Sequence, residues 1–422
     1  MKEYIYNILG ILFMVLFVSC AGRINHKENL KMNDSAWVIV PTEDFSNKQK
    51  DTVAIATFMA VGDIMVHRWQ MQKAYVVSDS VFDFSPSFRY VKPVFDNADW
   101  VLGNLETTFA GKNNGRDSTV LGYSCFPYFN SPEAFAGALK YAGFDMVSTA
   151  NNHTIDSYLS GVFNTLDVLD SVGIYHVGTY RNLIEKERFC LLDINGIKVG
   201  FWGCTYSLNG NSLKKENSFV VDEFRNYNEE KVERLCDKIK MIKEEGAEFV
   251  VVMVHFGTEY QKSPNKHQRS VAKAFAYSGA DVILGSHPHI LQPIEYLDFE
   301  IEGKKKRTLV AYSLGNFISS QVQRDSLLKD VGAIISFSVK KDAKGVALNE
   351  LKVMPTYSYW KTQEIGVVPL ISVYNNPKKY RFLRKRSIEQ IQTSYQQTLN
   401  TLTQSFNNDY KIDSLGWIII QD

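Results

Sequence analysis

Apolar and polar positions follow two different periods along the chain, and each period predicts one kind of element. Short runs that are apolar at consecutive positions are typical of strands covered on both faces. Segments of helical period lie between them, and the amphipathic segment 228–246 ends at Gly246 as helices often do. The alternation predicts an α/β body over residues 53–356. The strand runs are VAIATFMAV, DWVLGNL, FDMVSTA, KVGFWGC, EFVVVMVH, DVILG and TLVAYSL.

The N-terminal part has a different pattern from this body. Lys2 precedes an apolar stretch too short for a comfortable membrane span, which predicts a signal peptide over residues 1–20. The run FVSCAG resembles a bacterial lipobox and makes Cys20 the expected lipidation site. An uncleaved N-terminal anchor is the alternative. Either way we expect an exported protein of the cell envelope, attached to a membrane through its N-terminal lipid or anchor.

Two further segments flank the body. Residues 21–52 are rich in Asn, Lys, Asp and Ser, the composition of a flexible tether. Residues 357–422 read as a mostly helical C-terminal extension, a polar appendage with little apolar face. We therefore expect four parts: leader, tether, body and extension.

Composition narrows the class of partner. The 422 residues are 45% hydrophobic and 13% aromatic, which predicts a folded globular chain. Basic and acidic residues nearly cancel, 47 against 46, so the chain has no large net positive charge that would indicate binding to nucleic acid. Few cysteines remain after Cys20, and a hairpin turn at Asn195-Gly196 would place Cys190 opposite Phe201 and not Cys204. We predict no disulfide there.

Polar side chains with metal-binding chemistry follow five of the predicted strands. Loops at the carboxyl ends of strands in an open α/β sheet converge, so residues far apart in sequence meet there. Carboxylate, amide and imidazole groups without thiolate suit one or two divalent transition ions, Mn, Fe or Zn. Each residue alone also has an ordinary structural role, so a polar cleft that binds no metal is the alternative. The candidate ligands are Asp63, Glu106, Asn152, His255, His287 and His289.

Six ordered motifs over about residues 58–321 resemble one protein family. They are AVGDIMVHR, GNLETTF, TANNHTIDSYLSG, VVMVHFGTEYQ, GSHPHILQPIE and YSLGNFISSQ. The series looks like that of the CapA/PgsA-type poly-γ-glutamate capsule biosynthesis proteins, which are similar in fold to calcineurin-like metallophosphoesterases. The resemblance implies a four-layer α-β-β-α sandwich of two mixed sheets. It also implies a part in making or exporting an anionic surface polymer.

The same resemblance implies roles for single residues. His153 would match the catalytic histidine, and Asp156 is placed to orient its imidazole. Arg68, Glu259 and Asn316 are candidates for substrate binding. The ligand roles implied are Asp63 and His289 on a first metal, Glu106 as the bridging carboxylate, and Asn152, His255 and His287 on a second metal.

The first motif departs from the wider superfamily. Met65 stands where a histidine ligand is usual, and we do not expect His67, two residues later, to replace it. Glu106 stands where an aspartate is usual. The first metal position is thus short of a ligand, so a single-metal site or a weaker catalyst stays open.

Three functions follow from these patterns. The first is a metal-dependent hydrolase of a phosphoester or amide bond in polymer biosynthesis, with the anionic polymer or membrane components of its synthase as partners. The second is a non-catalytic scaffold or polymer-binding module on the same fold. The third is an exported metallophosphoesterase unrelated to capsule.

Overall fold

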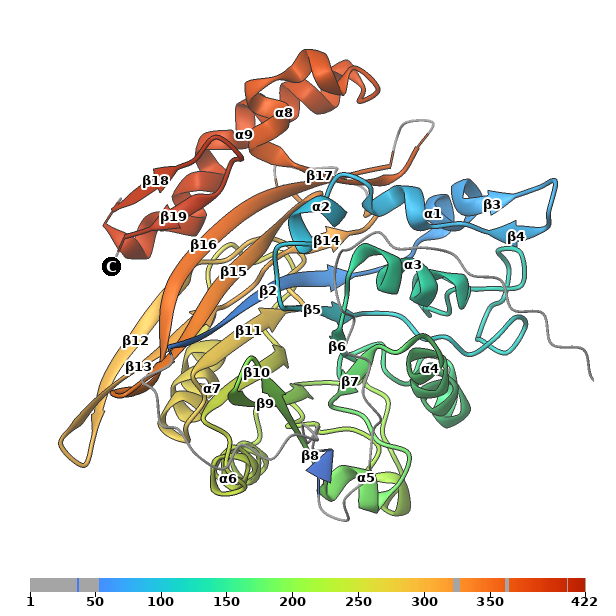
Figure 1. The fold of residues 1–422 in the computed structure, drawn as a ribbon. Helices are drawn as coiled ribbons and strands as arrows, with labels where there is room; N and C mark the ends of the chain where they lie inside the picture. The colour runs from blue at the N-terminus through green and yellow to red at the C-terminus, as the bar shows by residue number, and fades with distance from the viewer. Residues whose placement is uncertain (1–35, 38–52, 322–326, 361–363, 408, 422) are drawn as a thin grey trace, which may run out of the picture.

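Two large mixed β-sheets pack face to face in the computed structural model, which describes residues 36–37, 53–321, 327–360, 364–407 and 409–421 (Figure 1). The predicted leader, Cys20 and nearly all of the tether lie outside the described residues. No helix in the described part is long and apolar enough to cross a membrane.

The first sheet contains seven strands in the order β1-β8-β9-β10-β11-β13-β12. Its central strands run parallel, and hairpins add antiparallel strands at both sides. The β8–β9 hairpin pairs Cys190 with Phe201, as predicted from the turn at Asn195-Gly196. The strands are β1 (Ala36–Trp37), β8 (Phe189–Ile194), β9 (Ile197–Thr205), β10 (Phe249–His255), β11 (Val282–Ser286), β12 (Ile294–Ile301) and β13 (Lys304–Ala311).

The second sheet contains ten strands along the path β18-β19-β16-β15-β2-β5-β6-β7, with β14 on β2 and β17 on β16. Strands β2, β5, β6 and β7 are parallel, whereas β15 and β16 form a long antiparallel hairpin. The strands are β2 (Ala54–Ile64), β5 (Trp100–Leu105), β6 (Met146–Ser148), β7 (Tyr175–Val177), β14 (Asn316–Ile318), β15 (Val331–Asp342), β16 (Gly345–Tyr359), β17 (Gly366–Pro369), β18 (Tyr410–Ile412) and β19 (Ile418–Ile420).

Helices cover the outer face of each sheet and complete the four layers. The helix predicted over 228–246 forms as α6 and begins with the Asn228 side chain accepting from the Lys231 amide. Helices α6 and α7 lie outside the seven-stranded sheet, and α2, α3 and α4 outside the other (Figure 1). The helices are α1 (Arg68–Ala74), α2 (Lys92–Phe95), α3 (Ala134–Ala142), α4 (Tyr158–Val172), α5 (Leu183–Glu187), α6 (Glu229–Glu244) and α7 (Lys266–Tyr277).

Alternate residues of the central strands serve different cores, which explains why these strands are apolar at both parities. Phe58 of β2 and Phe201 of β9 meet between the sheets with ring centroids 6.2 Å apart. Their neighbours Met59 and Trp202 point the other way, into the cores under the helices. The predicted sandwich of two mixed sheets between helices is therefore confirmed.

The C-terminal part is continuous with this body. The boundary expected after residue 356 falls inside β16, and α8 (Leu370–Asn375) and α9 (Lys385–Thr403) add side chains to the core between the sheets. Helix α9 buries Ile391 and Leu402 along a narrow stripe. The stripe is hard to see in the sequence because Gln, Ser and Thr fill most positions around it.

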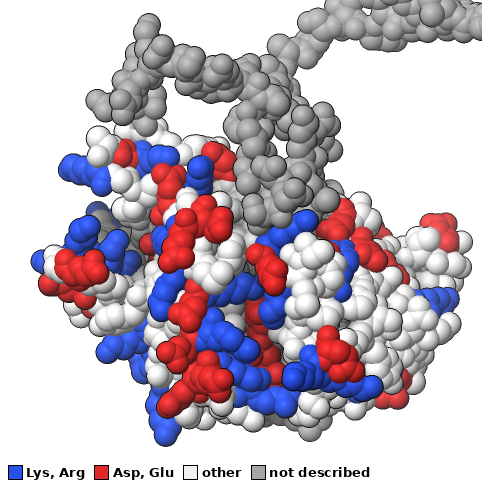
Figure 2. Space-filling model, turned by 90° about the horizontal axis from the view of Figure 1, so that it is seen from below, with Lys and Arg blue, Asp and Glu red and all other residues white. Residues whose placement is uncertain are grey.

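Charges of both signs are interspersed over the face that carries α5 and α6 (Figure 2). Blue and red side chains alternate there without a large area of one sign. The near-neutral composition is thus also mixed locally on this face, which offers no broad electrostatic surface for a polyanion.

Candidate metal centre

The carboxyl ends of strands from both sheets meet at one place, and the predicted ligands lie there. His255 is the last residue of β10, and His287 and His289 follow β11 in the neighbouring position of the same sheet. Asp63 near the end of β2 and Glu106 directly after β5 come from the opposite sheet. All five side chains are buried, with 3% or less of each residue exposed.

The segment between the two histidines after β11 has a strained backbone. His287 and His289 have φ angles of 100° and 58°, a region of backbone conformation that residues other than glycine rarely adopt. The Pro288 carbonyl between them accepts from the Tyr260 amide at 2.9 Å, and the His287 amide contacts Asp63 Oδ1 at 3.3 Å. Such strain costs on the order of 1–3 kcal/mol per residue and persists where it aims side chains at a site.

Glu106 has a buried carboxyl oxygen that no donor satisfies. Its Oε1 has no hydrogen-bond partner in the described structure, yet it lies 3.6 Å from His255 Nε2, 3.8 Å from His289 Nε2 and 3.9 Å from His153 Nε2. These distances are too long for hydrogen bonds. Burial and then the negative charge of Asp63 raise the pKa of Glu106 well above its usual range.

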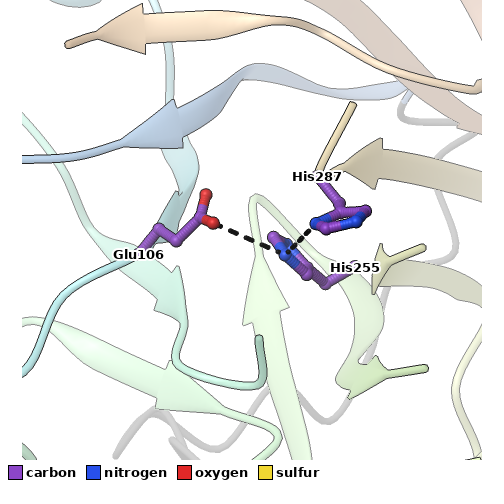
Figure 3. A group of neighbouring side chains, drawn as sticks. All are labelled: Glu106, His255 and His287. Atoms are coloured by element: carbon purple, nitrogen blue, oxygen red, sulfur yellow. Dashed lines mark hydrogen bonds and ion pairs between the residues drawn. The ribbon is translucent and has the colours of Figure 1, made fainter. Parts of the chain in front are cut away.

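His255 and His287 bring neutral imidazoles to the same point (Figure 3). His287 Nδ1 is 3.1 Å from His255 Nε2, and Asn152 Oδ1 is 2.8 Å from that same nitrogen. Burial lowers the pKa of His255 well below its ordinary value and that of His287 to about 3, and the neighbouring histidines add to both effects. Both rings are therefore neutral, and each keeps one nitrogen lone pair.

Asp63 and His289 form the other half of the cluster. His289 Nδ1 lies 3.0 Å from Asp63 Oδ2 and 3.1 Å from Asn316 Oδ1. Burial raises the pKa of Asp63, but His289 outweighs burial and holds that pKa below its usual range. Burial lowers the pKa of His289, and Asp63 reverses that effect and raises it. Asn316 thus lies in contact with the cluster, and its expected role in substrate binding stays a prediction.

His153 faces the cluster from a loop after β6 and is oriented by Asp156. His153 Nδ1 and the Phe129 amide both lie 2.7 Å from Asp156 Oδ2. With its Nδ1 proton donated to that carboxylate, the ring presents Nε2 toward Glu106. The Phe129 ring packs edge-on against His153, with centroids 4.7 Å apart. This loop holds the imidazole in one orientation.

The remaining candidates lie outside or at the rim of the cluster. Arg68, at the start of α1, and Glu259, after β10, are exposed, and a Glu259 oxygen lies within 4.8 Å of nitrogens of His287 and His289. The His67 Nδ1 accepts from the Ser320 amide at 3.3 Å, and burial lowers the His67 pKa to about 3. The neutral ring therefore carries its proton on Nε2, which makes that atom a donor and not a ligand.

Several residues that hold the cluster were not assigned a role from sequence. Asn104 Nδ2 donates to Asp63 Oδ1 at 2.9 Å and contacts His255 Nδ1 at 3.2 Å. Its position two residues before Glu106, on the same side of the strand end, is a signal that could have identified it. The Tyr206 hydroxyl contacts His287 Nε2 at 3.0 Å from a loop with no such pattern.

The donor set fits a divalent transition metal. Two groups of ligand atoms, each within 4.8 Å, share Glu106: one adds Asp63 and His289, the other His255 and His287. Oxygen and imidazole donors without thiolate suit Mn, Fe or Zn, and a cation between them would satisfy the Glu106 oxygen. The division matches the roles implied by the resemblance, which stay predictions for metal binding itself.

Comparison with known families agrees with the motif series. Residues 57–321, more than half of the chain, match the family described as bacterial capsule synthesis protein PGA_cap. This chain belongs to that family. The capsule biosynthesis protein CapA of Bacillus anthracis is 28% identical over 334 residues, covering 78% of this chain and 73% of its own. The PGA biosynthesis protein CapA of Bacillus subtilis is 30% identical over 303 residues, with 70% of each chain covered.

Among solved structures, the PGA_cap chain is similar to a phosphatase from Mycoplasma pneumoniae. The match covers 72% of this chain and 94% of that one, at 13% identity and a TM-score of 0.39. Similarity at this level says nothing about activity.

Proposed function

We propose that this PGA_cap family member is a metal-dependent hydrolase of the cell envelope that acts on an anionic surface polymer in capsule or poly-γ-glutamate biosynthesis. The names of its Bacillus relatives support the pathway, and the predicted lipidated N-terminus supports the location. The bond is a phosphoester or an amide, the two classes that such centres hydrolyse without a side-chain nucleophile.

The observation that carries the catalytic part is the unsatisfied Glu106 oxygen. A buried carboxylate without donors is costly, and proteins remove that cost by pairing it or by metal coordination. Three imidazole nitrogens face it at 3.6–3.9 Å, from His255, His289 and His153. We infer that His255 and His289 are ligands and that His153 is the proton-transfer group.

Six residues of the cluster would bind the metal ions in this proposal. Asp63, Glu106, His289, His255 and His287 would hold one or two divalent ions, with Asn152 as a further oxygen donor. A bound ion supplies a Lewis acid that polarises an oxygen of the scissile group and makes water a nucleophile at neutral pH.

His153 acts on the leaving group in this proposal. Asp156 keeps the imidazole proton on Nδ1, so Nε2 carries the lone pair; it would take up a proton released by the attacking water and pass that proton to the departing oxygen or nitrogen. The burial of the cluster limits the number of waters that compete for this proton.

Elemental analysis of the purified full-length chain tests the proposal. We expect one or two transition-metal ions per chain, lost in His287→Ala and retained in His176→Ala, which removes a histidine of β7 that contacts Asp170. Hydrolysis of a nitrophenyl phosphodiester or of a γ-linked glutamate oligomer should follow the metal content. A chain that holds no metal and cleaves neither probe would contradict the hydrolase proposal and favour the non-catalytic scaffold or polymer-binding module.

A further inference from the structure

The loop over residues 106–130 carries an arginine that lies over two tyrosine rings, and both tyrosines are close in sequence to residues of the candidate site. The Arg116 guanidinium carbon lies 4.9 Å from the Tyr128 ring centroid and 4.5 Å from that of Tyr158. Tyr128 precedes Phe129, which packs against His153, and Tyr158 comes two residues after Asp156. Both rings are thus adjacent in the chain to residues that contact His153 or its carboxylate partner.

The loop is fixed against the site by its own contacts. Asn130 accepts from the Ala110 amide at 2.8 Å and donates to the Gly111 carbonyl at 2.9 Å. Gly115 lies so close to Asn130 that an added Cβ would come within 2.7 Å of that side chain. The segment that leads into Arg116 is therefore held in one place against Asn130, the residue that follows Phe129.

Arg116 differs from the other arginines that stack on aromatic rings in the described structure. Arg89, Arg269 and Arg307 also lie over rings, and each pairs with a carboxylate of the same chain. Arg116 forms no ion pair or hydrogen bond with any described residue, and its Nε is buried without a partner. The Arg116 guanidinium therefore contacts two aromatic rings, but its N–H groups donate to no described residue.

A guanidinium whose carbon lies over two aromatic rings still has N–H groups available for a further partner. Its faces are occupied by cation–π contacts, so its planar edge of N–H groups is left to bind an oxyanion with two parallel hydrogen bonds. The three comparison arginines show this same combination of ring and carboxylate within one chain. Arg116 lacks the carboxylate.

We propose that Arg116, between Tyr128 and Tyr158, is a substrate subsite that binds a carboxylate or phosphate oxyanion of the polymer on the His153 side of the cluster. The inference rests on the proposed function for the identity of the polymer. It adds a substrate contact beyond Arg68 and Glu259, and it assigns the recognition of a charged repeat to this loop. The subsite would place the repeat next to the bond that faces His153.

Equilibrium binding to the full-length, metal-loaded chain tests the subsite, with a short γ-linked glutamate oligomer as the carboxylate probe and inorganic phosphate as the phosphate probe. We expect Arg116→Gln to weaken binding of one probe by roughly tenfold or more, as loss of a charge-assisted pair does. Arg116→Lys keeps the charge without the planar fork and should recover only part of the affinity. Arg269→Gln, which also removes a ring-stacked arginine, should leave binding unchanged.

The outcomes separate this inference from the proposed function. Loss for the oligomer alone assigns the subsite to carboxylates, and loss for phosphate alone assigns it to phosphates. Equal affinity in wild type and Arg116→Gln, or no binding of either probe by wild type, would overturn the subsite. Metal content measured on the same samples judges the metal centre independently, because Arg116 contributes no ligand to it.

Discussion

Two buried carboxylates in this molecule have opposite surroundings. Asp222, in the loop before α6, receives Lys238 Nζ at 2.7 Å and Trp202 Nε1 at 2.8 Å on one oxygen and Lys186 Nζ at 2.8 Å on the other. Glu106 is equally buried, but one of its oxygens has no donor at all. The oxygens of Asp222 are thus fully paired with donors of the same chain, whereas the surroundings of Glu106 contain more hydrogen-bond acceptors than donors.

The difference shows in the direction of the pKa shifts. Burial raises the pKa of both carboxyl groups, but Lys238 and Lys186 outweigh it for Asp222 and lower that pKa below its usual range. For Glu106 the neighbouring Asp63 adds to burial, and the pKa rises. A chain that satisfies one buried carboxylate so fully and leaves one oxygen of the other without a donor is arranged for a cation from outside at the second position.

The largest effect should come from Glu106→Gln. The amide keeps the size of the side chain but removes the charge shared by the two ligand groups, so we expect loss of metal and a roughly thousandfold fall in hydrolysis. In metal-free protein the same change should leave the free energy of unfolding unchanged or raise it, because it removes an unpaired buried acid. Metal analysis and denaturant unfolding measure the two parts, with Glu295→Gln as control. A strongly destabilised metal-free variant would mean that Glu106 has a structural partner.

Asp222→Asn should have the opposite profile. It leaves Lys238 buried beside a neutral group, and breaking such a pair costs about 3–5 kcal/mol of unfolding free energy. Metal content should be unchanged, because Asp222 belongs to none of the ligand groups. Asp237→Asn, at an exposed pair with Lys240, should cost less than about 1 kcal/mol. Loss of metal in Asp222→Asn would show that the two clusters are coupled through the intervening loop.

A smaller effect is expected from Asp156→Asn, which tests the orientation of His153. The amide oxygen still accepts from the Phe129 amide, but the charge that stabilises a protonated imidazole is lost. Changes of this kind reduce activity by about 10–100-fold. The fall should be in kcat, with an altered pH profile and full metal content. A change confined to KM would place Asp156 in substrate binding instead.

The α/β alternation and the meeting of the ligand residues could be predicted from the sequence because both depend on local patterns, whereas the four-layer sandwich was implied by the resemblance to the CapA/PgsA-type family. Strands apolar at both parities require cover on both faces, and Trp202 and Phe201 point into different cores. Strand ends then bring polar residues together wherever they fall in the chain, so Asp63 and His289 meet although 226 residues separate them.

The residues that support the site could not be predicted in the same way. Tyr206 reaches His287 from the loop after β9, where its amide donates to the His255 carbonyl at 3.0 Å, and no periodicity encodes that path. The pairing of β14 with β2 brings Asn316 to His289, a contact that was not expected from the sequence. Both placements are set by contacts between segments that are distant in sequence, which a local pattern does not contain.

The last and smallest effect distinguishes the two carboxylates by pH. The folded-state pKa of Asp222 is lowered, so its contribution to stability is fully present above the unfolded pKa of about 4 and is lost as pH falls toward the folded value. The difference in unfolding free energy between wild type and Asp222→Asn should therefore narrow as pH falls below about 4. The pKa of metal-free Glu106 is raised in the folded state, so its protonated form is favoured there. Wild type should therefore gain stability relative to Glu106→Gln as pH falls from that raised pKa toward the ordinary pKa of a glutamate. Two unfolding series against pH with opposite slopes would separate a structural carboxylate from one that requires a cation, and parallel slopes would contradict the distinction.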